Sequence, residues 1–245
     1  MAIEVFNRIE KKYLITEDVY GKFFDKIIPY MEMDAFCKDG KFYSINNIYF
    51  DTENNDLIRT SIDKPVYKEK LRLRSYGVPE FNDIVFLEIK KKYNGIVNKR
   101  RTLLKLNQAY DFLFDGIMPS EGDYLNAQVL KELKFFMKFY NPVAKLFLAY
   151  DRVAMFGKDD ENLRITADRN IRTRRDDLRL EDGDYGDKLL QDGQVLIEIK
   201  TASSFPVWLV DILTELDMKG TSFSKYGTEY RQFMDNTLQK RGAIC

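Results

Sequence analysis

The sequence contains no histidine among its 245 residues. This absence excludes Ser-His-Asp and Cys-His nucleophilic catalysis, a histidine general base and histidine-ligated zinc. Cys37 and Cys245 are the only cysteines, so a thiolate metal cluster and a disulfide framework are excluded as well. A catalytic metal would therefore be bound by carboxylate and phosphate oxygens, the ligands that suit Mg²⁺ or Mn²⁺.

Several other signals are also missing. The sequence has neither a GxxxxGK[ST] motif nor a GxGxxG motif, so the familiar glycine-rich phosphate loops are excluded. No segment approaches the roughly 20 apolar residues that cross a bilayer. The first six residues lack the basic start and apolar run of a secretory signal. Together with the scarcity of cysteine, these absences predict a cytoplasmic protein.

The charges of the chain cancel, because 39 Lys and Arg residues face 39 Asp and Glu residues. A dedicated nucleic-acid binder would be clearly basic, so we expect no nucleic-acid partner. A zero net charge still permits cations to gather in one place and carboxylates in another. With 44% hydrophobic residues and no linker rich in Pro, Gly or Ser, we expect a single domain over residues 1–245.

Apolar residues alternate with polar ones over most of the chain, which predicts strands. The expected strands span residues 5–14, 42–52, 66–76, 84–93, 97–106, 144–156, 162–171 and 194–201. Helical spacing predicts helices over residues 19–31, 107–114, 126–140 and 206–216 and from 226 onward. Short turns at residues 77–79 and 94–95 favour an antiparallel meander, so the expected fold class is α+β.

The strand over residues 66–76 carries Lys68, Lys70, Arg72 and Arg74 on one face and apolar residues on the other. In an ordinary half-buried strand such charges point into water. Here the charged faces concentrate arginine, and the pairing of Glu with Lys two residues on is repeated, as at residues 88–90 and 198–200. This composition is unusual for a merely solvated face.

The apolar faces of the predicted helices offer an alternative covering for the sheet. If helices 19–31, 126–140 and 206–216 pack against its apolar face, the sheet can turn its charged face inward. We therefore expect an antiparallel β-barrel tunnel with a charged lumen, flanked by helices. A lumen with many cations requires a polyanion, and arginine matches phosphate oxygens in a bidentate manner.

Nine short motifs resemble one known family. Residues 8–14, Arg-Ile-Glu-Lys-Lys-Tyr-Leu, resemble the N-terminal ExExK signature of the triphosphate tunnel metalloenzymes. Eight further motifs follow in the family's order, at residues 48–52, 70–74, 87–90, 99–101, 150–152, 163–168, 197–200 and 223–226. Together they resemble the polyphosphate polymerase domain of the vacuolar transporter chaperone (VTC) type, in the CYTH-like superfamily of triphosphate tunnel proteins.

One position departs from the signature. Arg8 stands where tunnel triphosphatases carry the first glutamate of ExExK. The resemblance implies that the polymerase branch tolerates a basic or neutral residue at this position. The departure therefore favours a polymerase over a two-metal hydrolase.

The resemblance also implies roles for individual residues. Lys225, Arg72, Arg74 and Lys200 would be catalytic. The phosphate-binding residues would be Lys12, Lys90, Lys99, Arg101, Arg152, Arg164, Ser224 and Tyr226. Glu198 would hold the metal, with Glu10 and Glu88 as helpers.

Plainer interpretations stay open for some of these residues and for three aromatic ones. Lys12 and Lys99 are equally typical of solvated surface lysines, and Glu10 is equally typical of a salt-bridge partner for a neighbouring lysine. The aromatic residues Tyr150, Phe147 and Trp208 are more typical of a core than of a nucleotide-stacking site.

The implied function is an ATP-dependent polyphosphate polymerase that uses Mn²⁺ or Mg²⁺. Phosphoryl transfer needs alignment and positive charge more than covalent chemistry, so a protein without histidine can catalyse it. The alternatives are a tripolyphosphate or nucleoside triphosphate hydrolase of the same fold, and a non-catalytic polyphosphate sensor. The expected partners are ATP and polyphosphate, and export of the product would require a separate membrane protein.

Overall fold

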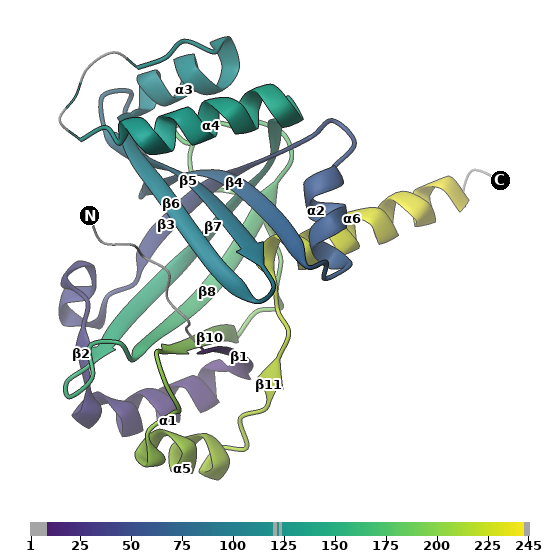
Figure 1. The fold of residues 1–245 in the computed structure, drawn as a ribbon. Helices are drawn as coiled ribbons and strands as arrows, with labels where there is room; N and C mark the ends of the chain where they lie inside the picture. The colour runs from purple at the N-terminus through teal and green to yellow at the C-terminus, as the bar shows by residue number, and fades with distance from the viewer. Residues whose placement is uncertain (1–8, 120–121, 123, 243–245) are drawn as a thin grey trace.

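The computed structural model describes residues 9–119, 122 and 124–242 of the chain. The described residues form one antiparallel sheet of 11 strands, with helices packed on both of its faces (Figure 1). The strands are β1 (Ile9–Thr16), β2 (Met31–Met33), β3 (Tyr43–Asp51), β4 (Tyr67–Tyr76), β5 (Ile84–Tyr93), β6 (Ile96–Lys105), β7 (Val143–Gly157), β8 (Arg164–Arg174), β9 (Asp187–Lys188), β10 (Gln194–Thr201) and β11 (Gly220–Thr221). The helices are α1 (Glu17–Ile27), α2 (Asp56–Ile62), α3 (Leu106–Asp115), α4 (Ala127–Tyr140), α5 (Val207–Glu215) and α6 (Lys225–Gly242).

The sheet is curled and tunnel-like, and its path follows the order β11-β1-β10-β8-β7-β3-β4-β5-β6. The α+β fold with an antiparallel, charged inner face is confirmed. The expected closure into a barrel is wrong, because no ladder joins β6 to β1 within the described part of the chain. The second edge of β1 is already occupied, since Lys12 and Tyr13 pair with Thr221 and Gly220 of β11.

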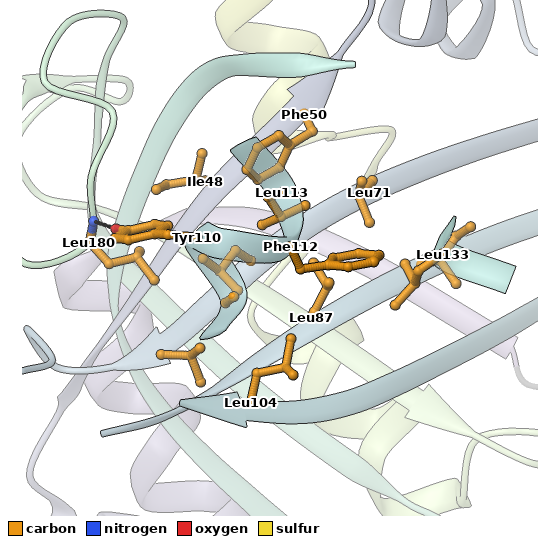
Figure 2. Close-up of a cluster of buried hydrophobic side chains, with 14 of the residues drawn as sticks. Ile48, Phe50, Leu71, Leu87, Leu104, Tyr110, Phe112, Leu113, Leu133 and Leu180 are labelled. Carbon is orange, nitrogen blue, oxygen red and sulfur yellow. Dashed lines mark hydrogen bonds between the residues drawn. The ribbon is translucent and has the colours of Figure 1, made fainter. Parts of the chain in front are cut away.

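A large hydrophobic cluster lies on the outer face of β4, β5 and β6, where α3 and α4 cover it (Figure 2). Alternation along the strands sends Leu71, Leu87 and Leu104 to this side, and each is fully buried. The cluster also holds a hydrogen bond, because Leu180 N donates to Tyr110 Oη at 2.9 Å. This covered outer face leaves the alternate, charged residues of the same strands to the inner face.

A second cluster covers the outer face of β1, β8 and β10, against α1 and α5. Thr16 is the N-cap of helix α1, since its Oγ1 accepts a hydrogen bond from Val19 N, and Glu17 and Asp18 lie in the first turn of the helix. The fully buried Phe23 and Ile27 are its contribution to the cluster. The helices expected over residues 19–31 and 206–216 thus have the covering role predicted for them.

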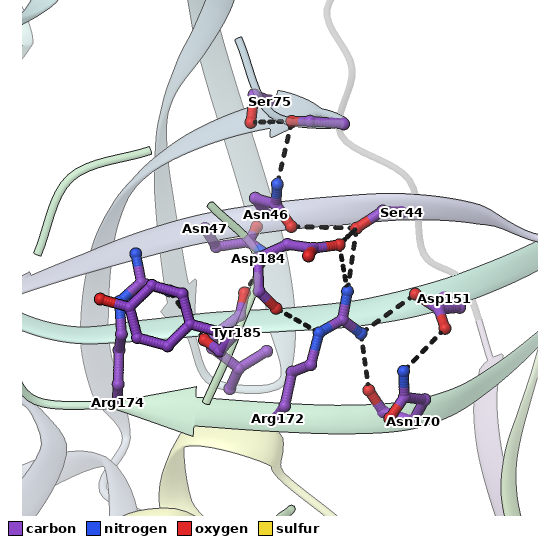
Figure 3. A network of polar contacts seen from close by, with 12 residues as sticks. Ser44, Asn46, Asn47, Ser75, Asp151, Asn170, Arg172, Arg174, Asp184 and Tyr185 are labelled. Atoms are coloured by element: carbon purple, nitrogen blue, oxygen red, sulfur yellow. Dashed lines mark hydrogen bonds and ion pairs between the residues drawn. The ribbon is translucent and has the colours of Figure 1, made fainter. Parts of the chain in front are cut away.

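A polar network between these clusters fixes the segment before β9 to the outer face (Figure 3). Arg172 on β8 forms ion pairs with Asp151 at 3.0 Å and with Asp184 at 2.5 Å. Asn170 Nδ2 donates to the other oxygen of Asp151 at 3.0 Å, and Ser44 Oγ lies 3.1 Å from Asp184 Oδ2. Because Arg172 is buried, these partners are required to satisfy its guanidinium.

The predicted strands over residues 84–93 and 194–201 coincide with β5 and β10, and the other predicted strands overlap observed ones. Four elements were not predicted: α2, β2, β9 and β11. Arg8 lies outside the described residues. None of the described helices combines the length and apolar character needed to span a membrane.

A basic cleft inside the curled sheet

A cavity of about 800 Å³ opens between β1, the β4–β5–β6 meander, α2 and the beginning of α6. Its basic lining residues are Lys11, Lys12, Lys64, Lys68, Lys70, Lys90, Lys92 and Arg231. Glu10 is the one acidic residue among the described residues that line it. The cavity therefore has a large excess of positive charge, which suits a polyanionic ligand.

Lys70 lies at the centre of this excess charge. Burial, together with the positive charges of Lys68, Lys90, Lys12 and Arg72, lowers its pKa to about 7. Lys70 faces Lys90 across the β4–β5 ladder, so two lysines stand side by side on the inner face. An anionic ligand that neutralised the positive charges around Lys70 would raise the pKa of Lys70 again.

Glu88 organises the cations of β4 and β6. Its Oε2 lies 2.6 Å from Arg72 Nε and 3.9 Å from Arg74 Nη1, while its Oε1 lies 2.5 Å from Lys99 Nζ. Burial opposes ionisation of this carboxyl, but Arg72, Arg74 and Lys99 together hold its pKa well below the usual range. Arg72 and Arg74 are also oriented by Tyr49, Asn47 and Tyr150.

Asp168 forms the corresponding centre on β8. Arg152 binds it in a bidentate manner, with Nε and Nη2 at 2.6 and 2.7 Å, and Lys225 Nζ lies 2.5 Å from Oδ2. Burial would raise the pKa of Asp168, but these two cations lower it. The ring of Tyr150 lies under both cations, 4.9 Å from the Arg152 guanidinium carbon and 4.6 Å from Lys225 Nζ.

Glu198 and Glu10 come together at the edge of the cleft. Lys200 Nζ lies 2.5 Å from Glu198 Oε1 and 3.9 Å from Glu10 Oε2, and Lys12 lies 3.2 Å from Glu10. Burial opposes the ionisation of Glu198. The positive charges of Lys200, Lys12 and Lys225 nevertheless hold the pKa of Glu198 well below its usual range. Thr166, the cross-strand partner of Glu198, has a buried Oγ1 without a hydrogen-bond partner among the described residues.

Glu198, Glu10 and Thr166 offer only oxygen atoms, the type of ligand that a hard divalent cation takes. Such an ion takes its remaining ligands from water and substrate phosphates, as Mg²⁺ commonly does. Glu88 belongs to the separate Arg72–Lys99 group, and no group of three or more carboxylates suited to a metal occurs in the described part of the chain. The metal roles predicted for Glu198, Glu10 and Glu88 stay predictions.

The family model of the VTC domain matches residues 7–234 of the sequence. The chain belongs to the VTC domain family. The search of curated proteins found no match.

Two solved structures are similar to this VTC domain. A candidate adenylate cyclase from Bacillus halodurans is 16% identical with a TM-score of 0.55, and the match covers 89% of this chain and 93% of that one. A Hippeastrum protein described as a candidate adenylyl cyclase with a dominant triphosphatase activity is also 16% identical. Its TM-score is 0.48, with 89% and 92% of the two chains covered. The likeness to the Bacillus protein shows that the two chains share a fold.

The VTC domain places the remaining predicted site residues in different surroundings. Arg101 is exposed, with its guanidinium carbon 5.4 Å from the centre of the Phe86 ring. Arg164 lies over the Phe156 ring and 3.4 Å from Asp34, and its Nε is buried without a partner among the described residues. Both belong to the inner face, where Arg101 is the cross-strand partner of Glu88 and Arg164 is that of Lys200.

Ser224 and Tyr226 have contacts that stabilise α6. Ser224 lines the cavity, and its Oγ accepts a hydrogen bond from Gly227 N at 3.2 Å. Tyr226 is buried in a hydrophobic cluster, and its hydroxyl donates to Asp51 at 3.3 Å. Their predicted phosphate contacts stay predictions.

Several residues of the site were missing from the sequence-based set, among them Lys70 and Asp168. Lys70 shares the alternating face of Arg72 and Arg74, and that alternation could have identified it. Asp168 ends one of the nine motifs, but its role as the shared partner of Arg152 and Lys225 depends on contacts between distant segments. Phe147 is fully buried and Trp208 stacks on Tyr30 at 4.3 Å, so neither ring belongs to the cleft.

Proposed function

We propose that this VTC domain is a polyphosphate polymerase, which transfers the γ-phosphate of ATP to the end of a polyphosphate chain. The observation that carries the proposal is the basic cavity, with Lys70 surrounded by other cations and its pKa lowered to about 7. Such an arrangement is unfavourable when empty and favourable with a linear polyanion. Membership of the VTC domain family supports the same substrate class.

In the proposed reaction, a terminal oxygen of the chain attacks the γ-phosphorus of ATP. The bond from this phosphorus to the β–γ bridging oxygen breaks, a bond to the chain forms, and ADP leaves. The attacking oxygen is already ionised near neutral pH, so no strong general base is required. The chain's own residues therefore have to align two polyanions and neutralise the charge that develops between them.

Arg72 and Arg74 suit that task because Glu88, Tyr49 and Asn47 already fix their orientation. Lys225 and Arg152 are held in the same way by Asp168. Pre-oriented cations need little reorganisation when the transferred group becomes more negative, which lowers the barrier. Lys200 and Lys12 would bind further phosphate oxygens beside Glu198.

Glu198 and Glu10 would hold Mn²⁺ or Mg²⁺, near the Thr166 hydroxyl, which has no hydrogen-bond partner among the described residues. When bound, this ion would neutralise phosphate charge and help to orient the triphosphate. Glu198 and Glu10 lie on neighbouring strands and share Lys200, which could move to a phosphate once a metal occupies the carboxylates.

The stoichiometry of the products tests the proposal. Purified protein with ATP and Mn²⁺ should release ADP without an equal amount of inorganic phosphate, and EDTA should stop the reaction. Arg74→Ala should lose this activity, whereas Arg100→Ala should keep it because Arg100 contacts Glu132 and not the Glu88 group. Equal release of ADP and phosphate would instead identify a hydrolase.

A further inference from the structure

Four aromatic side chains form an uninterrupted cluster at the end of the inner face away from the cavity. Phe36 stacks on Tyr76 with ring centres 5.4 Å apart and planes 3° apart. Tyr76 contacts Phe86 edge-on at 5.5 Å, and Tyr43 lies 5.9 to 6.0 Å from Tyr76 and Phe36. We call Phe36, Tyr43, Tyr76 and Phe86 the aromatic rim.

The outer member of the rim is exposed. Phe36 is 64% exposed and Tyr76 is 40% exposed. Neither residue is part of the hydrophobic clusters of the fold. Phe36 lies in the short 3₁₀ segment Ala35–Gly40, and Asp34 before that segment contacts Arg164 of the inner face. The segment thus places a phenyl ring at this end of the inner face, with more than half of its surface open to solvent.

The rim adjoins the proposed phosphate-binding arginines. Phe86 is the cross-strand partner of Arg74, and Arg101 lies over its ring at 5.4 Å. Tyr76 follows Arg74 by two residues on the same face of β4, a separation of about 7 Å along a strand. Along β4, the order is therefore lysines at the cavity, arginines in the middle and aromatic rings at the far end.

The two ends of the inner face differ in the ligand groups that they suit. The cavity end is lined by lysines, and its one aromatic lining residue, Phe223, packs partly buried against a hydrophobic cluster. A phosphate chain carries no aromatic group and suits the lysines. A nucleoside triphosphate carries a base, for which the rim offers stacking surface beside cations.

We propose that the aromatic rim is the nucleobase-binding part of the site, with the exposed face of Phe36 as the stacking surface for the base of ATP. This inference rests on the proposed use of a nucleoside triphosphate. The triphosphate then extends from the rim past Arg101 and Arg74 toward Arg72. The growing polyphosphate occupies the lysine-lined cavity at the other end, so donor and acceptor meet at the arginines.

Binding measurements on the full chain test the inference without requiring turnover. Titration calorimetry would compare a non-hydrolysable ATP analogue with inorganic tripolyphosphate, both with Mg²⁺. Phe36→Ala should weaken binding of the ATP analogue by roughly 5-fold or more, the effect expected for loss of one base-stacking contact. Tripolyphosphate affinity should stay unchanged, and Phe36→Trp should retain the affinity for the analogue.

Phe135→Ala is the matched control. Phe135 and Phe139 on α4 also form an exposed stacked pair, with centres 5.9 Å apart, but they lie on the outer side of the fold. This variant should bind both ligands as the wild type does. The inference is overturned if Phe36→Ala leaves analogue affinity unchanged or weakens both ligands equally.

The result is separable from the proposed function. If the wild type makes no polymer but Phe36→Ala selectively weakens the analogue, the nucleobase site stands and the polymerase proposal fails. If polymer forms and Phe36→Ala binds both ligands normally, the polymerase stands and the nucleobase site fails.

Discussion

Lys225 and Asp168 are 57 residues apart in the sequence, and Lys225 Nζ lies 2.5 Å from Asp168 Oδ2. The contact ties the first residue of α6 to the middle of β8 on the inner face of the sheet. Arg152 binds the same carboxylate, which is fully buried. One acidic residue thus positions two of the cations on which the proposed reaction depends.

Removal of the Asp168 charge should destabilise the fold as well as the site. Breaking a buried ion pair by removing one partner costs about 3 kcal/mol or more, because the other charges are left without compensation. We expect Asp168→Asn to lower the free energy of urea unfolding by an amount of this order. Asp192→Asn, which removes an exposed partner of Lys188, should cost less than about 1 kcal/mol.

The effect of Asp168→Asn should depend on pH. The folded-state pKa of Asp168 is lowered, so its ionisation contributes stability above the unfolded-state value of about 3.9. This contribution is lost as the pH falls through the folded-state pKa. The difference in unfolding free energy between wild type and variant should therefore be constant from neutral pH to about pH 5 and narrow in stronger acid. A difference independent of pH would contradict the assigned ion pair.

Lys70 should make polyphosphate binding sensitive to pH near neutrality. Its pKa of about 7 means that the free protein loses this charge as the pH rises through 7. A polyanion prefers the charged form, so binding above that pH should take up a proton and become weaker. Calorimetry of tripolyphosphate binding in buffers of different ionisation enthalpy measures that uptake.

Lys70→Arg provides the comparison, because a guanidinium stays charged throughout this range. The ratio of wild-type to variant affinity should fall between about pH 6 and 8. Titration of the ligand affects both proteins equally and therefore cancels in this ratio. Identical pH profiles for the two proteins would show that Lys70 does not titrate in this range.

Glu198→Gln should abolish metal-dependent turnover while the fold stays intact. The substitution removes the charge that a divalent ion requires and keeps the shape of the side chain. Turnover would be measured across a Mn²⁺ titration, with circular dichroism as the check on folding. The control is Glu215→Gln on α5, which removes only an ion pair with Lys26 on the outer face. Wild-type rates in Glu198→Gln would defeat the assignment.

Much of the sheet was predictable because its strands alternate strictly. Lys70, Arg72 and Arg74 fall on one face of β4 and Leu71 and Leu73 on the other, as the period of two requires. The helix α2 was not predictable in this way, since it has only seven residues and its N-cap residue, Asn55, makes no side-chain cap hydrogen bond. Its first N–H, that of Asp56, donates to Thr52 Oγ1 at 2.9 Å, and the next two, of Leu57 and Ile58, donate to Asp51 at the end of β3 at 2.8 and 2.9 Å.

The site was predictable as a set of residue types and not as an arrangement. The alternating pattern indicates which charges share a face, but the curl of the sheet decides which strands meet. It is the curl that brings Lys12 of β1 near Lys70 of β4. The sequence also did not indicate that the sheet stays open. Two residues of β11 occupy the edge of β1 that a closed barrel would need.

Chain growth from a primer is the decisive test of polymerase activity. The protein would be incubated with ATP, Mn²⁺ and a short polyphosphate primer, and the products would be resolved on a polyacrylamide gel stained for polyphosphate. A polymerase should give a ladder that lengthens with time, requires the metal and is absent with Arg74→Ala. Shortening of the primer, or its persistence at the starting length while ATP is hydrolysed, would contradict the proposed polymerase activity.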